Sequence, residues 1–306
     1  MNLRQAKYMV AIYKEGQISS AAKKLFISQS ALSQIVQNVE KEIGVTLFKR
    51  TTPITLTNAG NIYIKTVEKM LMLEEGMDRE MQEITTECSG TLRIGFPTTY
   101  AKIFLPTLFA LYKKNFPNVN VEILQGGSAT MPEHINSGEV DIAFMASNKT
   151  APEDLHNIVL RKEKILLLSS PTTKLAKRIK PYTPIRILEA KYEEFVTLSK
   201  GHGLRALQDS IFANNGISPK TLIYVDDSLL AVHLAAKSNA VVLLPDTFLT
   251  KELENPSLYP YYPLSNENYR RKFYLCWSKD LYIPNYMYGF IELVKSMFPE
   301  NIELPQ

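Results

Sequence analysis

The spacing of hydrophobic residues divides the chain into three regions. Between residues 3 and 43, apolar residues recur every three or four positions, which is the period of amphipathic helices. Residues 58–88 continue this period without proline and with glycine only at positions 60 and 76. From residue 91, unbroken apolar runs alternate with helical stretches, as in an α/β domain with buried, parallel strands. The pattern predicts a helical N-terminal module, a long connecting helix and a larger α/β body.

Three short helices are expected in the N-terminal module. The first runs from Leu3 to Lys14 and ends at Gly16, and the second opens at Ser19 or Ser20 as its N-cap. The third follows the turn Phe26-Ile27-Ser28, with Ser28 as its cap. The residues expected to form the shared core are Ala6, Met9, Val10, Tyr13, Ala21, Ala22, Leu25, Leu32, Ile35, Val36, Val39 and Ile43.

The third helix has a polar face without charge, because no charged residue occurs between Gln29 and Val39. A short helix, a tight turn and a helix of this kind form a helix-turn-helix, whose second helix enters the DNA major groove. Gln, Asn and Ser match the mixed donors and acceptors of base edges, whereas Glu would repel phosphates. The side chains expected to face DNA are Ser28, Gln29, Ser30, Ser33, Gln34 and Gln37.

A β-hairpin wing is predicted after this helix, because the β-rich runs Thr46–Phe48 and Ile54–Thr57 flank a turn. The turn offers cations and hydroxyls suited to phosphate or minor-groove contact, and we expect DNA contacts from Arg50, Thr51 and Pro53.

Residues 1–60 hold eight basic and three acidic residues, a net +5, while the whole chain carries +4. This local excess favours a polyanion-binding surface and a winged helix-turn-helix over residues 1–60.

The connecting helix, residues 58–88, contains a heptad-like seam interrupted by Glu74. An exposed linker helix has little else to bury this stripe against, so the seam predicts a homodimer, which suits a two-part operator. The alternative is that the stripe packs on its own domain. The seam positions are Tyr63, Val67, Met70, Glu74, Met77, Met81, Ile84 and Cys88.

A small-molecule site is predicted in the body, because ligands of open α/β sheets bind beyond the carboxyl ends of the strands. The loops that follow TLRIGF, VEILQ, VDIAFM, VTLS and IYV are rich in hydroxyls and glycine. Ordinary turn chemistry accounts for the same residue types, so both interpretations stay open. The candidate ligand-binding residues are Thr98, Thr99, Gly127, Ser128, Ser147, Ser199, His202 and Asp226.

A family resemblance covers the N-terminal module. The elements AAKKL, SQSALSQ, V-x-x-E-K-E-I-G-V-T-L-F-K-R and T-x-A-G, between Ser20 and Gly60, resemble the DNA-binding domain of LysR-type transcriptional regulators. The family commonly has Pro where this chain has Ser30, and often Arg where it has Gln34. Because both positions face DNA in the family, the operator sequence does not follow by analogy.

The resemblance implies an architecture and a function. It implies an α/β fold with an N-terminal winged helix-turn-helix, a long linker helix and a two-lobed periplasmic-binding-protein-like effector domain over residues 90–306. Lobe 1 is expected at about 90–162 and 267–306, and lobe 2 at about 163–266, with crossings near Arg161–Glu163 and Ser265–Asn268. The implied function is binding of double-stranded operator DNA by a homodimer or homotetramer, modulated by a small-molecule effector.

Other classes of protein find little support. No apolar run approaches the roughly 18 residues of a membrane span, no secretory signal is evident, and two cysteines fit a reducing cytoplasm. The four histidines lack metal-ligand spacing, and no nucleophile elbow or phosphate loop occurs, so neither catalysis nor a cofactor is expected. The alternatives are a ligand-binding protein or enzyme whose N-terminal module binds protein, and a redox switch between Cys88 and Cys276.

Overall fold

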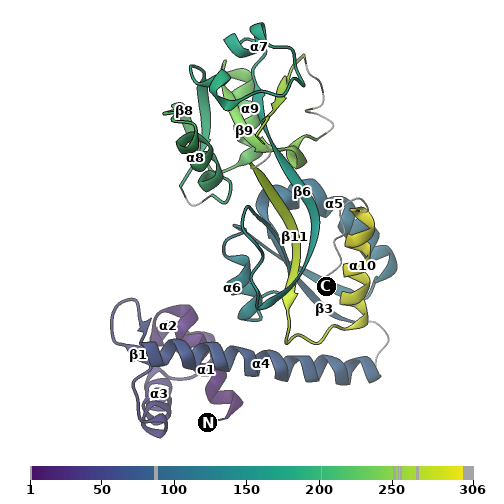
Figure 1. Ribbon diagram of the computed structural model, residues 1–306. Coiled ribbons are helices and arrows are strands. Elements are labelled where there is room, and N and C mark those ends of the chain that lie inside the picture. The colour runs from purple at the N-terminus through teal and green to yellow at the C-terminus, as the bar shows by residue number, and fades with distance from the viewer. Residues whose placement is uncertain are drawn as a thin grey trace.

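The computed structural model describes residues 2–85, 89–200, 202–250, 253, 255, 257–266 and 269–298. Figure 1 shows a small helical domain joined by one long helix to a two-lobed body that stands above it. This arrangement confirms the predicted class, an α/β protein with a winged helix-turn-helix, a linker helix and a periplasmic-binding-protein-like body.

The N-terminal domain consists of α1 (Leu3–Glu15), α2 (Ile18–Lys24) and α3 (Gln29–Ile43). Gly16 ends α1 in the left-handed conformation, with φ 65°, as predicted. The Ser28 hydroxyl accepts from the Ala31 amide at 3.1 Å, so the predicted cap of α3 is confirmed.

Some N-terminal predictions were wrong in detail. The helix α2 begins at Ile18, with Gln17 as an N-cap that makes no side-chain bond, so Ser19 and Ser20 lie in its first turn. Ile18 packs against the core of the domain, and this contact starts the helix earlier than the serine pattern indicates. Tyr13 and Ile43 are each 43% exposed and do not belong to the buried core.

The wing consists of β1 (Phe48–Lys49) and β2 (Thr55–Leu56), which pair antiparallel as a shorter hairpin than predicted. Two contacts fix its position on the domain. The Ile54 amide donates to the Gly16 carbonyl at 2.7 Å, at the end of α1. The Glu40 carboxylate of α3 accepts from the amides of Leu47 and Phe48 at 2.7 and 3.2 Å. The wing is therefore held next to α3.

The linker helix α4 (Asn58–Thr85) is 28 residues long. Of the predicted seam, Val67 is buried against the N-terminal core and Glu74 pairs with Lys7 at 3.0 Å, so these two positions face their own domain. Cys88 lies outside the described residues, as does the side chain of Ile84. Among the described side chains of α4, the apolar ones exposed in this single chain are Ile62, Met70, Leu73, Met77 and Met81.

The body is built on one mixed sheet with the order β4-β3-β5-β11-β6-β9-β7-β8, and β10 pairs with β6. Its strands are β3 (Gly90–Pro97), β4 (Val119–Gly126), β5 (Ile142–Ser147), β6 (Leu155–Ser169), β7 (Glu194–Leu198), β8 (Lys220–Val225), β9 (Val241–Pro245), β10 (Tyr261–Pro263) and β11 (Arg270–Ser278). The helices are α5 (Thr98–Asn115), α6 (Met131–Asn136), α7 (Lys174–Arg178), α8 (Arg205–Asn214), α9 (Ser228–Lys237) and α10 (Asn285–Met297), with 3₁₀ turns η1 (Ile187–Ala190) and η2 (Asp246–Phe248).

Strand direction was predicted only in part. The pairs β3–β4, β3–β5, β7–β8 and β7–β9 are parallel, but β9 is antiparallel to β6, and β11 is antiparallel to β5 and β6. A continuous apolar run indicates burial on both faces of a strand and carries no information on the direction of its neighbour. For this reason the expectation of parallel strands was wrong for β6, which is antiparallel to β9 and β11.

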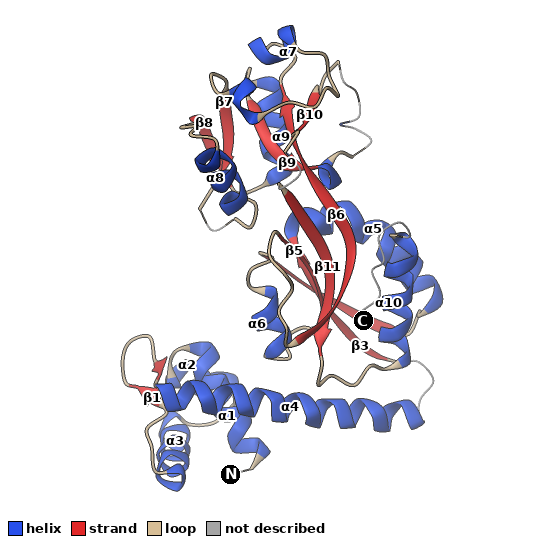
Figure 2. Ribbon diagram, in the orientation of Figure 1, coloured by secondary structure: helices blue, strands red, loops and turns tan. Residues whose placement is uncertain are grey.

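Two long strands, β6 and β11, join the lobes (Figure 2). They pair antiparallel, with Lys164 opposite Arg270 at one end and Leu155 opposite Ser278 at the other. Arg161–Glu163 lies inside β6, which pairs with β11 up to Lys164 and with β9 from Ile165, so the chain passes between the lobes here on a continuous strand. The second expected crossing, Ser265–Asn268, falls partly outside the described residues. Helix α10 packs on α5 and β3 of lobe 1, so the C-terminal segment returns to the first half of the body.

Candidate functional site

A groove of about 370 Å³ lies between α3, the start of α2 and the wing. Five residues expected to contact DNA line it together: Gln29, Ser33, Gln37, Arg50 and Thr51. Gln17 and Ser19 line the same groove and were not predicted, because they lie at the start of α2 and not on the polar face of α3. Thr52, which also lines it, belongs to the wing turn whose hydroxyls were expected to suit DNA. The groove thus combines amide and hydroxyl side chains with the cations of the wing.

The other four predicted residues lie outside the lining of this groove. Ser28 is engaged as the cap of α3, and its hydroxyl lies 3.1 Å from that of Ser30. Gln34 is exposed, and its amide donates to the Asn38 side chain at 3.0 Å. At the wing, the Thr51 hydroxyl donates to the Pro53 carbonyl at 2.7 Å.

A second cavity, of about 530 Å³, lies between the lobes of the body. Six of the eight candidate ligand-binding residues line it, which are Thr98, Thr99, Gly127, Ser128, His202 and Asp226. The structure places Ser147 and Ser199 outside this lining. The Ser147 hydroxyl accepts from the Lys149 amide at 3.0 Å, and the Ser199 amide extends the strand pairing to the Val225 carbonyl. These contacts place Ser147 and Ser199 at the ends of their strands, outside the cavity lining.

Arg271 is a cavity residue that was not predicted. It is 4% exposed, its guanidinium donates to the Ala146 carbonyl at 2.9 Å, and it lies opposite Glu163 in the pairing of β11 with β6. Glu163 is fully buried and accepts from the Tyr100 hydroxyl at 2.7 and 2.8 Å. Burial raises the pKa of Glu163, and the charge of Arg271 opposes that rise. The cavity lining thus includes one buried cation, Arg271, whose strand partner Glu163 is a buried carboxyl outside the lining.

His202 forms part of the lobe 2 wall. Its Nδ1 accepts from the Leu204 amide at 3.1 Å, which places the proton of the neutral ring on Nε2, 3.4 Å from the Ser228 hydroxyl. Burial lowers the pKa of His202, and the nearby Arg271 lowers it further. A neutral imidazole with a donor on Nε2 is therefore the expected form near pH 7.

An ion pair between Lys102 of α5 and Asp227 links the lobes beside the cavity. The Asp227 carboxylate also caps α9, accepting from the amides of Leu229 and Leu230 at 2.8 and 3.0 Å. Burial alone would raise the pKa of Asp227, but Lys102 and these amides lower it overall. Asp227 is therefore a structural anion, while Asp226 beside it is exposed.

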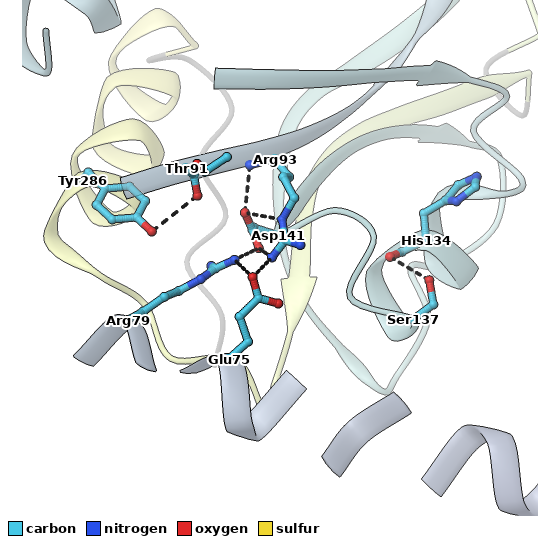
Figure 3. Close-up of polar contacts among 8 residues, drawn as sticks. All are labelled: Glu75, Arg79, Thr91, Arg93, His134, Ser137, Asp141 and Tyr286. Atoms are coloured by element: carbon cyan, nitrogen blue, oxygen red, sulfur yellow. Dashed lines mark hydrogen bonds and ion pairs between the residues drawn. The ribbon is translucent and has the colours of Figure 1, made fainter. Parts of the chain in front are cut away.

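A cluster of ion pairs joins α4 to lobe 1 (Figure 3). Asp141, only 2% exposed, accepts from Arg79 of α4 at 2.7 Å and from the guanidinium and backbone amide of Arg93 of β3 at 3.1 and 2.7 Å. Glu75 of α4 contacts both arginines from its more exposed position. The linker helix is therefore fixed to the body through one buried carboxylate.

Two family models match the chain. The bacterial regulatory helix-turn-helix protein model of the lysR family matches residues 3–61, and the LysR substrate binding domain model matches residues 86–299. The chain belongs to the LysR family of transcriptional regulators. This LysR regulator accordingly has an N-terminal DNA-binding domain and a C-terminal effector-binding domain, and its relatives are regulators rather than enzymes.

Individual relatives are distant in sequence. The chain is 28% identical over 248 residues to the uncharacterized HTH-type transcriptional regulator YybE of Bacillus subtilis, covering 80% of this chain and 83% of that protein. It is 25% identical over 302 residues to the HTH-type transcriptional regulator BenM of Acinetobacter baylyi, covering 97% and 96%.

The fold agrees with solved structures of full-length regulators. A full-length OxyR variant from Pseudomonas aeruginosa matches with a TM-score of 0.74 at 20% identity, over 100% of this chain and 99% of that chain. Full-length BenM matches with a TM-score of 0.59 at 23% identity, over 100% of both chains. At such identities the likeness establishes the shared fold.

The predicted alternative of a redox switch finds no support in the part of the chain that the structure describes. Cys276 is fully buried, and burial raises the pKa of its thiol to about 12, so it is not a reactive thiolate. Cys88 lies outside the described residues.

Among the described residues, no group of His, Cys, Asp or Glu could hold a metal ion, and no helix is long and apolar enough to cross a membrane.

Proposed function

We propose that this LysR regulator binds double-stranded operator DNA through the exposed face of α3 and the wing. The observation that carries the proposal is the groove in which Gln29, Ser33 and Gln37 lie beside Arg50 and Thr51. Uncharged amides and hydroxyls suit base edges, while the cation and hydroxyl of the wing suit phosphates. Ser28, Ser30, Gln34 and Pro53 remain proposed contacts at the rim of this surface.

Replacing Gln34 tests the assignment of base reading to α3. The Gln34→Ala variant should lose discrimination at one operator position, by about 1–3 kcal/mol for a lost base contact, with little change in binding to random duplex. Selection from a randomised DNA library gives the preferred sequences of both proteins. The control is Gln125→Ala, an exposed glutamine on β4. Identical sequence preferences for Gln34→Ala and the wild type would remove Gln34 from the reading surface.

Replacing Arg50 tests the wing. The Arg50→Ala variant should weaken binding to every duplex by a similar factor and reduce the slope of log K against log salt by about 1, as one phosphate contact is lost. Titrations of operator and random DNA at several salt concentrations measure both quantities. Lys65→Ala, at an exposed position of α4 outside the groove, should leave the slope unchanged. A loss confined to one sequence would show that Arg50 reads a base instead.

We further propose that the cavity between the lobes binds a small effector with an anionic group, such as a carboxylate. Arg271 and Lys200 contribute positive charge to its lining, and Thr98 and Thr99 lie at the start of α5, where free amides favour an anion. Asp226, exposed on the opposite wall, could pair with a cationic group of the same ligand.

A panel of small carboxylates tests the class of effector. A true effector at 100 times its Kd should stabilise the protein by about 2.7 kcal/mol, which appears as a rise in Tm. The matching amides, which have the same shape but no negative charge, should give no shift at equal concentration. Thermal melts of the full-length protein measure this, and equal shifts with acids and amides would refute an anion-binding site.

Effector binding is proposed to act by changing the arrangement of the two lobes. The lobes are joined by β6 and β11 and by the Lys102–Asp227 ion pair, so a ligand between them contacts both sides of one hinge. A ligand can shift this equilibrium only by its difference in affinity for the two arrangements.

Assembly and location complete the proposal. We propose a homodimer or homotetramer formed through α4, because Met70, Leu73 and Met77 are exposed apolar side chains that a partner surface would bury. The proposed domains are the winged helix-turn-helix over residues 1–60, the linker helix over residues 58–88 and the effector-binding domain over residues 90–306. We also propose a cytoplasmic location, since an operator-binding protein must share the compartment of the chromosome.

A further inference from the structure

A second basic segment lies far along the chain from the DNA-binding domain. Residues 171–192 carry six basic residues and one acidic residue, a net +5 that equals the charge of residues 1–60. The rest of the chain outside these two segments carries −6. The basic residues of the segment are Lys174, Lys177, Arg178, Lys180, Arg186 and Lys191. Operator binding by α3 and the wing does not account for this concentration of charge.

Four of the six basic residues line one hollow of about 640 Å³ at α7, η1 and the residues that flank η1; they are Lys174, Arg178, Arg186 and Lys191. All six basic side chains are exposed. The two carboxylates of the lining are engaged internally. Glu189 pairs with Arg178 at 2.6 Å, and Glu193, 7% exposed, accepts from the Leu175 amide at 2.7 Å. The lining therefore carries four basic and two acidic residues, a net +2, and Lys174, Arg186 and Lys191 are the cations left beside the Arg178–Glu189 pair.

Apolar side chains accompany the positive charge. Tyr192 is 80% exposed, and the Lys191 ammonium lies 4.6 Å from the centre of its ring. Leu188 of η1, 38% exposed, lines the same hollow. An exposed Tyr and Leu among Arg and Lys are typical of protein interfaces, where Tyr and Arg supply much of the binding energy. Contacts to duplex phosphates need no such apolar surface.

The position of this surface also favours a protein partner over DNA. Figure 1 shows α7 at the end of the body farthest from α1, α2 and α3. DNA seated on α3 of the same chain therefore lies at the opposite end of the molecule. A partner protein is not restricted to the path of the operator and can reach this end.

We propose that the hollow around α7 and η1, called here the lobe 2 basic surface, binds an acidic segment of a partner protein that places an apolar side chain beside Tyr192. Carboxylates of the segment pair with Lys174, Arg186 and Lys191, while its apolar residue covers Leu188 and the tyrosine ring. This inference does not depend on the proposed operator or effector.

The test uses the full-length protein and a fluorescent 12-residue peptide of alternating Asp and Glu with a central Leu. We expect binding by anisotropy, and the double variant Lys174→Glu/Lys191→Glu should weaken it at least 10-fold. The matched control Lys114→Glu/Lys149→Glu makes the same charge change at exposed positions outside the surface and should stay within 2-fold. If the charge reversals impair folding, the corresponding Gln pairs replace them, with an expected loss of about 3-fold.

The Tyr192→Ala variant separates a protein-binding surface from a phosphate-binding one. It should weaken the acidic peptide at least 3-fold and leave random duplex DNA unaffected. If Lys174→Glu/Lys191→Glu and Lys114→Glu/Lys149→Glu weakened peptide binding equally, the effect would come from overall charge. This result would overturn the proposal. If Lys174→Glu/Lys191→Glu weakened binding of duplex DNA as much as binding of the peptide, and Tyr192→Ala changed neither, the surface would bind phosphates. This result would also overturn the proposal.

Discussion

The Asp141→Asn variant is expected to lose about 3–5 kcal/mol of stability in the effector domain, because it removes the buried carboxylate that Arg79 and Arg93 share and leaves them only the more exposed Glu75. Asparagine keeps the shape of aspartate, so the loss reports charge and hydrogen bonding rather than a cavity. Urea unfolding can be followed through Trp277, the single tryptophan, which lies in β11 paired with β5. The midpoint of the transition should fall markedly.

The control for this variant is Glu75→Gln, which changes the other carboxylate that contacts the same arginines. Glu75 is 44% exposed, so its ion pairs are screened by water and their removal should cost about 1 kcal/mol or less. Equal destabilisation by the two variants would mean that burial of Asp141 does not determine the strength of the contact between α4 and lobe 1.

The Arg271→Met variant is expected to lose most of its response to an anionic effector. Loss of a charged hydrogen bond of about 1.5–3 kcal/mol corresponds to a roughly 10- to 150-fold weaker affinity for the carboxylate that stabilises the wild type. Methionine fills similar space, and DNA affinity without effector should change little. Ligand-dependent thermal melts give the affinity of each protein.

Two further variants make the Arg271 experiment specific. Arg161→Met removes a cation from β6 that pairs with Asp246 and lies outside the cavity lining, so the effector affinity should stay within 2-fold of the wild type. Arg271→Lys retains the buried charge beside Glu163 and should restore part of the affinity. An unchanged affinity in Arg271→Met, with the protein folded, would place the anion elsewhere in the cavity.

Local signals in the sequence were sufficient where neighbouring residues decide the structure. Ser28 caps α3 through an amide three residues away, and Gly16 ends α1 through its own backbone freedom. The amphipathic stripe of α3 buries Leu32, Val36 and Val39 as expected. A helix boundary was wrong where a tertiary contact intervened, as at Ile18.

Non-local contacts explain most of what the sequence did not predict. Arg271 is the second residue of β11, a strand that was not predicted, and its place in the cavity results from antiparallel pairing with a strand more than 100 residues earlier. Asp141 precedes β5 and meets Arg79 only because α4 lies on lobe 1. The rule that ligands bind beyond the carboxyl ends of the strands found six cavity residues, because short-range sequence patterns do locate the ends of strands.

The central claim is that an effector in the cavity between the lobes controls operator binding through α3 and the wing. A footprint of the full-length protein on its own upstream DNA, with and without the stabilising carboxylate, tests it most directly, with Arg271→Met as the matched variant. We expect a protected region with two half-sites that the carboxylate shortens or shifts for the wild type and not for Arg271→Met. A region unchanged by the ligand, or changed equally in both proteins, would contradict the claim.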